Sequence, residues 1–257
     1  GDNVRDQDWV YAVFEELGSA PPCIEAAKAL DAFSLFPGYE QTQNDAKSAY
    51  TQSFLRGTET WVALPYDRWP DWWKEKFKPE DKPVCLLVLA LYGHPDSGGY
   101  WEEDCNNRVQ SLGWRQLLDE GWRSCYWHEV YKSFLVIYVD DFKVASPYAH
   151  TKQIWQELSS VIDLGDYTEP KRFLGCQLHR FEAKAGDFAD ILRHNPELRP
   201  RGSEKAAPLT SVPGYNAATP VRGFVYDMEK YFAKNVQTYL DVTGTPATRL
   251  SAADTPF

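Results

Sequence analysis

Phe134-Leu-Val-Ile-Tyr-Val-Asp-Asp-Phe-Lys-Val-Ala145 is the stretch that decides the fold. An unbroken apolar and aromatic run leads into Asp140 and Asp141, and a second apolar stretch follows at once. Short runs rich in β-branched and aromatic residues favour strands, and aspartate tolerates the backbone geometry of a tight turn. The pattern therefore predicts a β-hairpin with two adjacent carboxylates at its tip.

Two neighbouring carboxylates repel each other unless a hydrogen-bond donor, a proton or a hard cation lies between them. Mg²⁺ suits such a place, because it prefers oxygen ligands and is commonly held by one or two carboxylates together with substrate phosphates. Acidic turns on a solvated surface are common as well. By themselves, Asp140 and Asp141 leave two interpretations open, a magnesium site and an ordinary solvated turn.

The composition of the 257-residue chain indicates a folded protein with a substantial core, since 43% of its residues are hydrophobic and 15% are aromatic. The formal net charge of −10 is unfavourable for phosphate binding, which usually relies on a basic surface. Residues 171–205, however, hold 8 basic and 5 acidic side chains. We therefore expect any phosphate-binding surface in the last third of the chain.

The cysteines and the apolar runs indicate the cellular compartment in which the protein works. The five cysteines include no Cys-x-x-Cys pair, which argues against a secreted disulfide scaffold and against a structural zinc site. No charged-then-apolar signal segment opens the chain, and its longest apolar run is too short to cross a bilayer. The sequence predicts an intracellular protein, cytoplasmic or nuclear, without a membrane partner.

Hydrophobic periodicity places helices and strands alternately along the chain. Helices are expected over 24–36, 100–118, 151–162 and 227–240, with Thr151 as an N-cap. Strands are expected over 61–64, twice within 124–139, and over 173–179. Residues 183–223 are rich in proline, glycine and charge and are the best linker candidate. The interleaving predicts an α+β fold with helices packed on a sheet.

Four sequence blocks follow one another in the order and at the spacings found in a known family. They are Asp45-Ala-Lys-Ser-Ala-Tyr50, Ala90-Leu-Tyr-Gly-His-Pro-Asp-Ser-Gly-Gly-Tyr-Trp101, Tyr138-Val-Asp-Asp141 and Phe173-Leu-Gly175. Together they resemble the reverse transcriptases of copia-type retrotransposons, and the resemblance runs from about residue 3 to the C-terminus. The chain departs from that family at Asp96-Ser97-Gly98, where Gln-Ser-Pro is usual, and it lacks the basic strand that precedes these blocks in the family.

The resemblance implies a reverse-transcriptase palm, which is an antiparallel sheet backed by helices, with partial fingers and a reduced helical thumb. Residues 1–182 would form the partial fingers and the palm, residues 183–223 a linker or insertion, and residues 224–257 a C-terminal, thumb-like helical segment.

The resemblance also implies roles for individual residues. Two Mg²⁺ ions, or Mn²⁺ in their place, would be held by three catalytic carboxylates during nucleotidyl transfer. The residues are Asp45, Asp140 and Asp141 for metal and catalysis, Ala46, Tyr50, Gly93 and Ser97 for the nucleotide, Phe173, Leu174 and Gly175 for the primer, and Lys171 as general acid. Simpler structural roles stay open for three of these residues. Asp45 could cap a helix, Tyr50 could be an ordinary core residue, and Lys171 could be a solvated surface residue.

The resulting hypothesis is an RNA-directed DNA polymerase that extends a primer on an RNA or DNA template with deoxynucleoside triphosphates. Other parts of a retroelement polyprotein would be further partners. The first alternative is an inert or domesticated retroelement fragment that binds nucleic acid or protein. A second alternative, a metal-dependent phosphoesterase using the same carboxylates, would leave the second and fourth blocks without a role.

Overall fold

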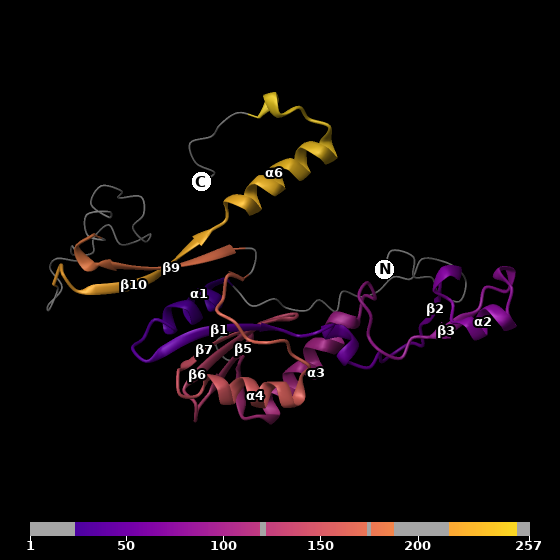
Figure 1. Ribbon diagram of the computed structural model, residues 1–257, viewed down its shortest axis with the longest axis horizontal. Helices are drawn as coiled ribbons and strands as arrows, with labels where there is room; N and C mark the ends of the chain where they lie inside the picture. Colours follow the sequence, from indigo (N-terminus) through magenta and orange to yellow (C-terminus); the bar gives the residue numbers. More distant parts are fainter. Residues whose placement is uncertain (1–23, 119–121, 174–175, 188–215, 251–257) are drawn as a thin grey trace. The chain divides into compact units, whose positions relative to one another are not determined.

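The structure, a computed structural model, describes residues 24–118, 122–173, 176–187 and 216–250 (Figure 1). The chain divides into two compact units, Gly1–Glu169 and Pro170–Phe257. Both units combine helices with antiparallel sheets. The division falls between Glu169 and Pro170, whereas the sequence placed the first boundary at residue 182. The assignment of these parts to a palm, partial fingers and a thumb stays a prediction.

The first unit is built on a five-stranded antiparallel sheet with the strand order β1-β7-β6-β5-β4. The strands are β1 (Tyr39–Asp45), β4 (Trp114–Leu117), β5 (Trp122–His128), β6 (Ser133–Tyr138) and β7 (Asp141–Pro147). Strands β4 to β7 form a meander, and β1 adds to the free edge of β7. The hairpin predicted from Phe134 to Ala145 is confirmed as β6 and β7.

Helices cover both faces of this sheet (Figure 1). They are α1 (Ile24–Phe33), α3 (Ser97–Ser111) and α4 (Thr151–Val161). Because side chains alternate along a strand, β6 and β7 each present one row to either face. One row packs with α3 and α4 in the main core, which includes Trp101, Val109, Leu135, Phe142, Val144, Ile154 and Leu158. Helix α1 packs against β6 and β7 through the other row.

A small Trp-rich segment lies between β1 and α3 in the chain. It pairs β2 (Trp61–Ala63) with β3 (Val84–Leu86) and contains the short helix α2 (Asp71–Lys76). The rings of Trp69 and Trp73 are buried and meet edge to face. The strand predicted at 61–64 is confirmed as β2.

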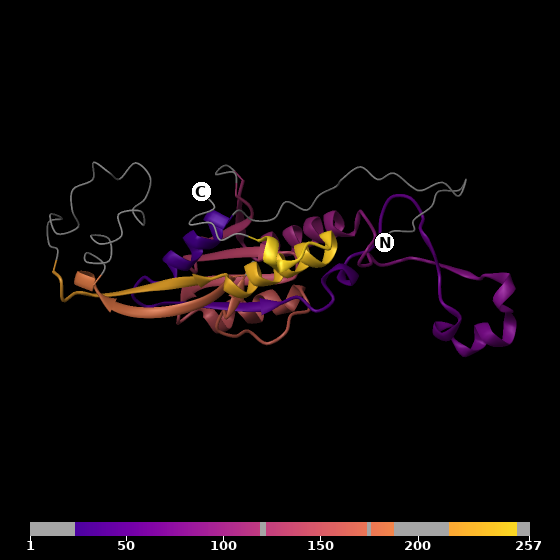
Figure 2. The ribbon, with the colours of Figure 1, turned by 90° about the horizontal axis from the view of Figure 1, so that it is seen from above.

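The second unit contains a three-stranded antiparallel sheet of the order β10-β9-β8. Its elements are β8 (Arg172–Phe173), β9 (Cys176–Lys184), β10 (Pro220–Asp227) and α6 (Glu229–Thr243). Strands β9 and β10 lie side by side along their whole length (Figures 1 and 2). The prediction of a linker over 183–223 is wrong at both ends, because residues 183–184 belong to β9 and 220–223 to β10. Residues 188–215 lie outside the described residues.

Three further local predictions need correction. The helix expected over 100–118 begins at Ser97 and ends at Ser111, because Gly113 takes a left-handed φ of 92° and the chain then enters β4. Thr151 is not the N-cap of α4, because His150 occupies that position and the Thr151 hydroxyl donates to Glu40 Oε1 at 2.6 Å. The single strand expected over 173–179 is divided between β8 and β9.

Helix α6 confirms the last predicted helix but buries none of its residues within the described part of the chain. The apolar side chains that its sequence lines up along one side, among them Phe232 and Val236, are exposed. No helix among the described residues is long and apolar enough to span a membrane.

Candidate active site

The ends of β1 and β7 bring two distant aspartates together. Asp45 is the last residue of β1 and is the direct antiparallel partner of Asp141, the first residue of β7. Paired residues project to the same side of a sheet, so both carboxylates leave the sheet on one face. Asp45 is exposed, whereas Asp141 is half-buried. The structure thus juxtaposes two of the three predicted carboxylate positions.

The third aspartate, Asp140, lies in the two-residue turn that joins β6 to β7. Its backbone carbonyl accepts a hydrogen bond from the Ala46 amide at 2.7 Å, which ties the turn to the residue that follows Asp45. Asp140, like Asp141, is half-buried. The backbone positions of all three aspartates are therefore linked by the β1–β7 pairing and by this one bond.

The turn is strained at Val139, which has a φ of 56°. A β-branched residue is rarely found in this left-handed region, and such a conformation costs about 1–3 kcal/mol. The indole Nε1 of Trp101, a fully buried residue of α3, donates to the Val139 carbonyl at 2.6 Å. The strained turn is consequently held by α3 on one side and by Ala46 on the other.

The outer edge of β1 is anchored to the segment that follows α4. The Gly165 amide donates to the Asp45 carbonyl at 3.0 Å, and Asn44 Nδ2 donates to the Gly165 carbonyl at 3.0 Å. A Cβ at residue 165 would lie 3.1 Å from Asn44 Oδ1. Glycine therefore permits the close approach that fixes the end of β1 beside the hairpin turn.

Tyr50 lies on a short 3₁₀ turn, Ala49–Gln52, shortly after Asp45. Its ring stacks on that of Tyr92, with centroids 4.4 Å apart. Burial raises the pKa of the Tyr50 hydroxyl, and the neighbouring Tyr92 and Asp140 raise it further. Tyr50 is thus neutral at physiological pH and close to the hairpin turn. Ala46, also predicted to contact the nucleotide, is buried in the core.

The predicted nucleotide-contacting loop leads directly into α3. Gly93 takes a left-handed φ of 91°. Ser97 is fully buried, and its hydroxyl accepts a hydrogen bond from the Leu91 amide at 2.9 Å. The side chain of Ser97 is therefore engaged within the protein, so its contact with a nucleotide stays a prediction.

His94 was not singled out from the sequence, yet it is the polar centre of this loop. Its Nε2 lies 3.2 Å from the Thr60 hydroxyl, and its Nδ1 accepts from the Asp96 amide at 3.2 Å. These bonds tie the loop to the strand connection near β2. The only available signal was its position beside Gly93, because a histidine in a polar loop has no distinctive spacing.

The residues predicted to contact the primer belong to the second unit. Phe173 is buried, and Lys171 is exposed, with its backbone carbonyl accepting from the Leu178 amide at 3.0 Å. Leu174 and Gly175 lie outside the described residues. Their predicted roles, and that of Lys171 as a general acid, stay predictions.

The aspartates of this site do not form a complete metal-binding group. Within the described ranges, no three histidine, cysteine, aspartate or glutamate side chains gather closely enough to hold a metal by themselves. The paired Asp45 and Asp141 instead suit an ion that takes one or two carboxylates and fills its remaining positions with water and substrate phosphates, which is typical of Mg²⁺.

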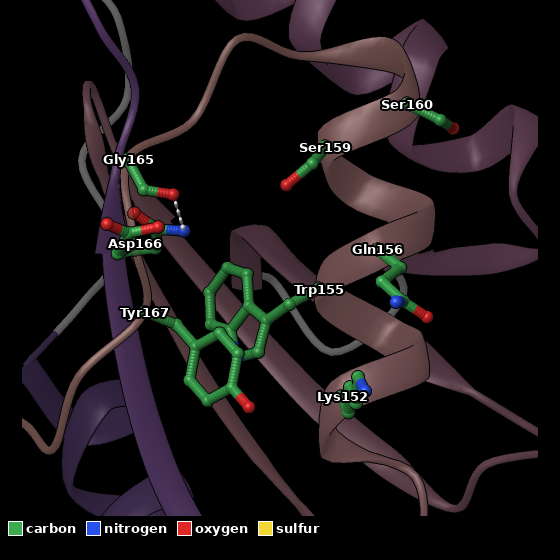
Figure 3. A pocket seen from close by; sticks show the side chains of 9 residues that line it. Lys152, Trp155, Gln156, Ser159, Ser160, Gly165, Asp166 and Tyr167 are labelled. Atoms are coloured by element: carbon green, nitrogen blue, oxygen red, sulfur yellow. Dashed lines mark hydrogen bonds between the residues drawn. The ribbon is translucent and has the colours of Figure 1, made fainter.

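A pocket of about 450 Å³ opens on the other face of β1, between α4 and residues 165–167 (Figure 3). The rings of Trp155 and Tyr167 stack there with their centroids 5.8 Å apart. Asn44 lines this pocket, and its neighbour Asp45 projects to the opposite side of the strand. The pocket is therefore separate from the paired carboxylates.

Comparison with known proteins gives one informative similarity. No family model matches the chain. Over 160 residues, the chain is 26% identical to the Saccharomyces cerevisiae protein named "Putative transposon Ty5-1 protein". The match covers 55% of this chain and 50% of that protein, so the chain spans about half the length of the curated relative that it matches. The sequence is therefore related to a transposon protein, in line with the retrotransposon part of the predicted resemblance.

Proposed function

We propose that this chain is the polymerase part of a retrotransposon-derived protein and catalyses RNA-directed DNA synthesis. The observation that carries the proposal is the direct pairing of Asp45 with Asp141, beside Asp140 in the hairpin turn. The similarity to a transposon protein supports it independently. The substrates would be a primer on an RNA or DNA template and the four deoxynucleoside triphosphates.

In this proposal Asp45, Asp140 and Asp141 would hold Mg²⁺, which would supply charge stabilisation for attack by the primer hydroxyl and for the leaving phosphates. Tyr50 has a suitable position beside the turn to contact the incoming sugar. Its ring is fixed against Tyr92, and a fixed ring is suited to excluding a ribose 2′-hydroxyl by steric contact.

Primer extension tests the proposal most directly. Wild-type protein, an RNA template with a DNA primer, Mg²⁺ and four deoxynucleotides should give extended product, and Asp140→Asn should abolish it while circular dichroism shows an unchanged fold. Asp71→Asn is the matched control, because Asp71 is 99% exposed and lies in the Trp-rich segment. Extension by Asp140→Asn at a rate near that of the wild type would refute the assignment.

An inert fragment that binds nucleic acid or protein is the second candidate, and the net charge of −10 is the observation that favours it. The two candidates separate on synthesis, and weak or missing binding of a primer–template would favour an inert fragment. A polymerase should bind a primer–template with an affinity that falls as salt rises, because phosphate contacts release counterions. An inert fragment gives no extension under any condition.

A further inference from the structure

A buried ion pair connects helix α1 with β7, the strand that begins with Asp141. Lys143 of β7 pairs with Asp31 of α1, and their side chains are only 1% and 2% exposed. Gln41 of β1 donates from Nε2 to the same Asp31 carboxylate. One buried carboxylate on α1 is therefore bound to β1 and to β7 at once.

The positions of these contacts matter because β1 and β7 carry Asp45 and Asp141. Lys143 is two residues after Asp141, and Gln41 is four residues before Asp45. By the alternation of side chains, all four residues are on one face of the sheet, which is the face covered by α1. The Asp31 carboxylate therefore binds the same two strands that carry the proposed catalytic pair, and it lies on the same face of the sheet.

Strand β1 needs such an anchor because its own sequence does not define its register. It reads Tyr-Glu-Gln-Thr-Gln-Asn-Asp and contains no aliphatic residue. Register is strongly specified where an apolar row faces a core and weakly specified where both faces of a strand are polar. A slip of one residue would move Asp45 to the opposite face from Asp141.

Polar bonds supply the register instead. On the α1 face, Gln41 is held by Asp31. On the other face, Trp155 Nε1 donates to the Thr42 hydroxyl at 2.9 Å. Asp31 also binds β7, through Lys143, as the Thr151 hydroxyl on the other face connects Glu40 of β1 with Ser146 of β7. Buried polar groups that fix a register are the best-attested use of such costly interactions.

We infer that Asp31, Lys143 and Gln41 form a positioning network that sets the register of β1 against β7 and so keeps Asp45 opposite Asp141. These three are positioning residues, since none of them is placed among the reacting groups. The catalytic consequence rests on the proposed polymerase function, whereas the structural consequence does not.

Hydrogen exchange of the Ala46 amide is a local reporter of this alignment, because that amide donates to the Asp140 carbonyl. Two variants weaken the network without leaving a lone buried charge: Gln41→Met, and the double variant Asp31→Leu/Lys143→Met. In both, Ala46 should exchange about tenfold faster relative to the Ile162 amide, which is bonded within the end of α4.

Val144→Ala is the matched control, because Val144 lies on β7 but faces the main core. It should lower the melting temperature and leave the ratio of Ala46 to Ile162 exchange within about twofold of the wild type. An unchanged ratio in Gln41→Met, or an equal increase in Val144→Ala, would overturn the inference. Gln41→Met removes one hydrogen bond made by an uncharged side chain and leaves the ion pair in place. This single variant therefore still tests the inference if the double variant fails to fold.

Primer extension by the same variants measures the catalytic consequence. The positioning role predicts that kcat falls about tenfold in Gln41→Met while KM for the primer–template stays within about twofold, because only the alignment of the carboxylates changes. A kcat equal to that of the wild type, despite faster Ala46 exchange, would overturn the catalytic part. Failure of the wild type to extend any primer would refute the polymerase proposal alone, since the exchange ratios still decide the positioning role.

Discussion

Replacing Trp101 with phenylalanine tests whether α3 holds the strained hairpin turn. The change removes the 2.6 Å hydrogen bond from Trp101 Nε1 to the Val139 carbonyl, and a typical bond of this kind contributes about 1 kcal/mol. Trp101 is 2% exposed, and phenylalanine is smaller by roughly 40 Å³, which adds about 1 kcal/mol at ~24 cal/mol per Å³ of cavity. We expect the free energy of unfolding to fall by about 2 kcal/mol, or by about 3 kcal/mol if water does not reach the freed carbonyl.

Urea denaturation followed by circular dichroism measures this loss, and primer extension measures its effect on the site. Val139 has a φ of 56°, so the freed turn should relax toward an unstrained geometry and move Asp140. Trp69→Phe is the matched control, because Trp69 Nε1 also donates to a backbone carbonyl, that of Leu64, at 2.8 Å but within the Trp-rich segment. A loss of less than about 0.5 kcal/mol in Trp101→Phe, or equal losses of extension in both variants, would refute the reasoning.

Two further predictions concern stability alone. Burial raises the pKa of the Cys105 thiol to about 12, so the folded state keeps a proton that the unfolded chain releases near pH 9, and stability should fall by about 1.4 kcal/mol per pH unit above pH 9. Urea unfolding at pH 8 and pH 10 should show this slope. Cys105→Ala should flatten it to the part due to Tyr50, Tyr126 and Tyr131, whose pKa values are also raised; an unchanged slope would contradict the assignment. Gly113→Ala should lower the melting temperature more than Gly38→Ala, because both glycines have a left-handed φ but only at Gly113 would a Cβ meet a side chain, 3.2 Å from His128 Nε2. Equal shifts by calorimetry would show that this contact costs nothing.

Local patterns in the sequence predicted the elements whose apolar residues repeat clearly. The β6–β7 hairpin followed from one apolar run interrupted by two aspartates, and α4 followed from Ile154 and Leu158 at helical spacing. Strand β4 was missed because the predicted helix was extended to residue 118, past its end at Ser111. Gly113 was the available stop signal, since glycine just after a helix typically takes the left-handed conformation that ends it.

The site could be predicted only in part, for a physical reason. Resemblance to a family suggested that Asp45 belongs with Asp141, and the structure pairs the two. The Asp31–Lys143 pair had no sequence signal, because a lysine within a strand ordinarily indicates a solvent-facing position and its partner lies far away in the chain. Thr151 was misassigned for a related reason, since its hydroxyl donates to Glu40, on another element, and His150 occupies the N-cap position.

The pairing of β1 with β7 has a consequence for how the protein is made. Asp45 and Asp141 are about a hundred residues apart, so at ~5–20 residues per second a ribosome adds the second roughly 5–20 s after the first. Until then the polar β1 has no neighbouring strand, and closing so long a loop is an entropically costly, late step in folding. The carboxylate pair therefore forms only after the β4–β7 meander is complete, and a nascent chain released before β7 would contain Asp45 without its partner Asp141.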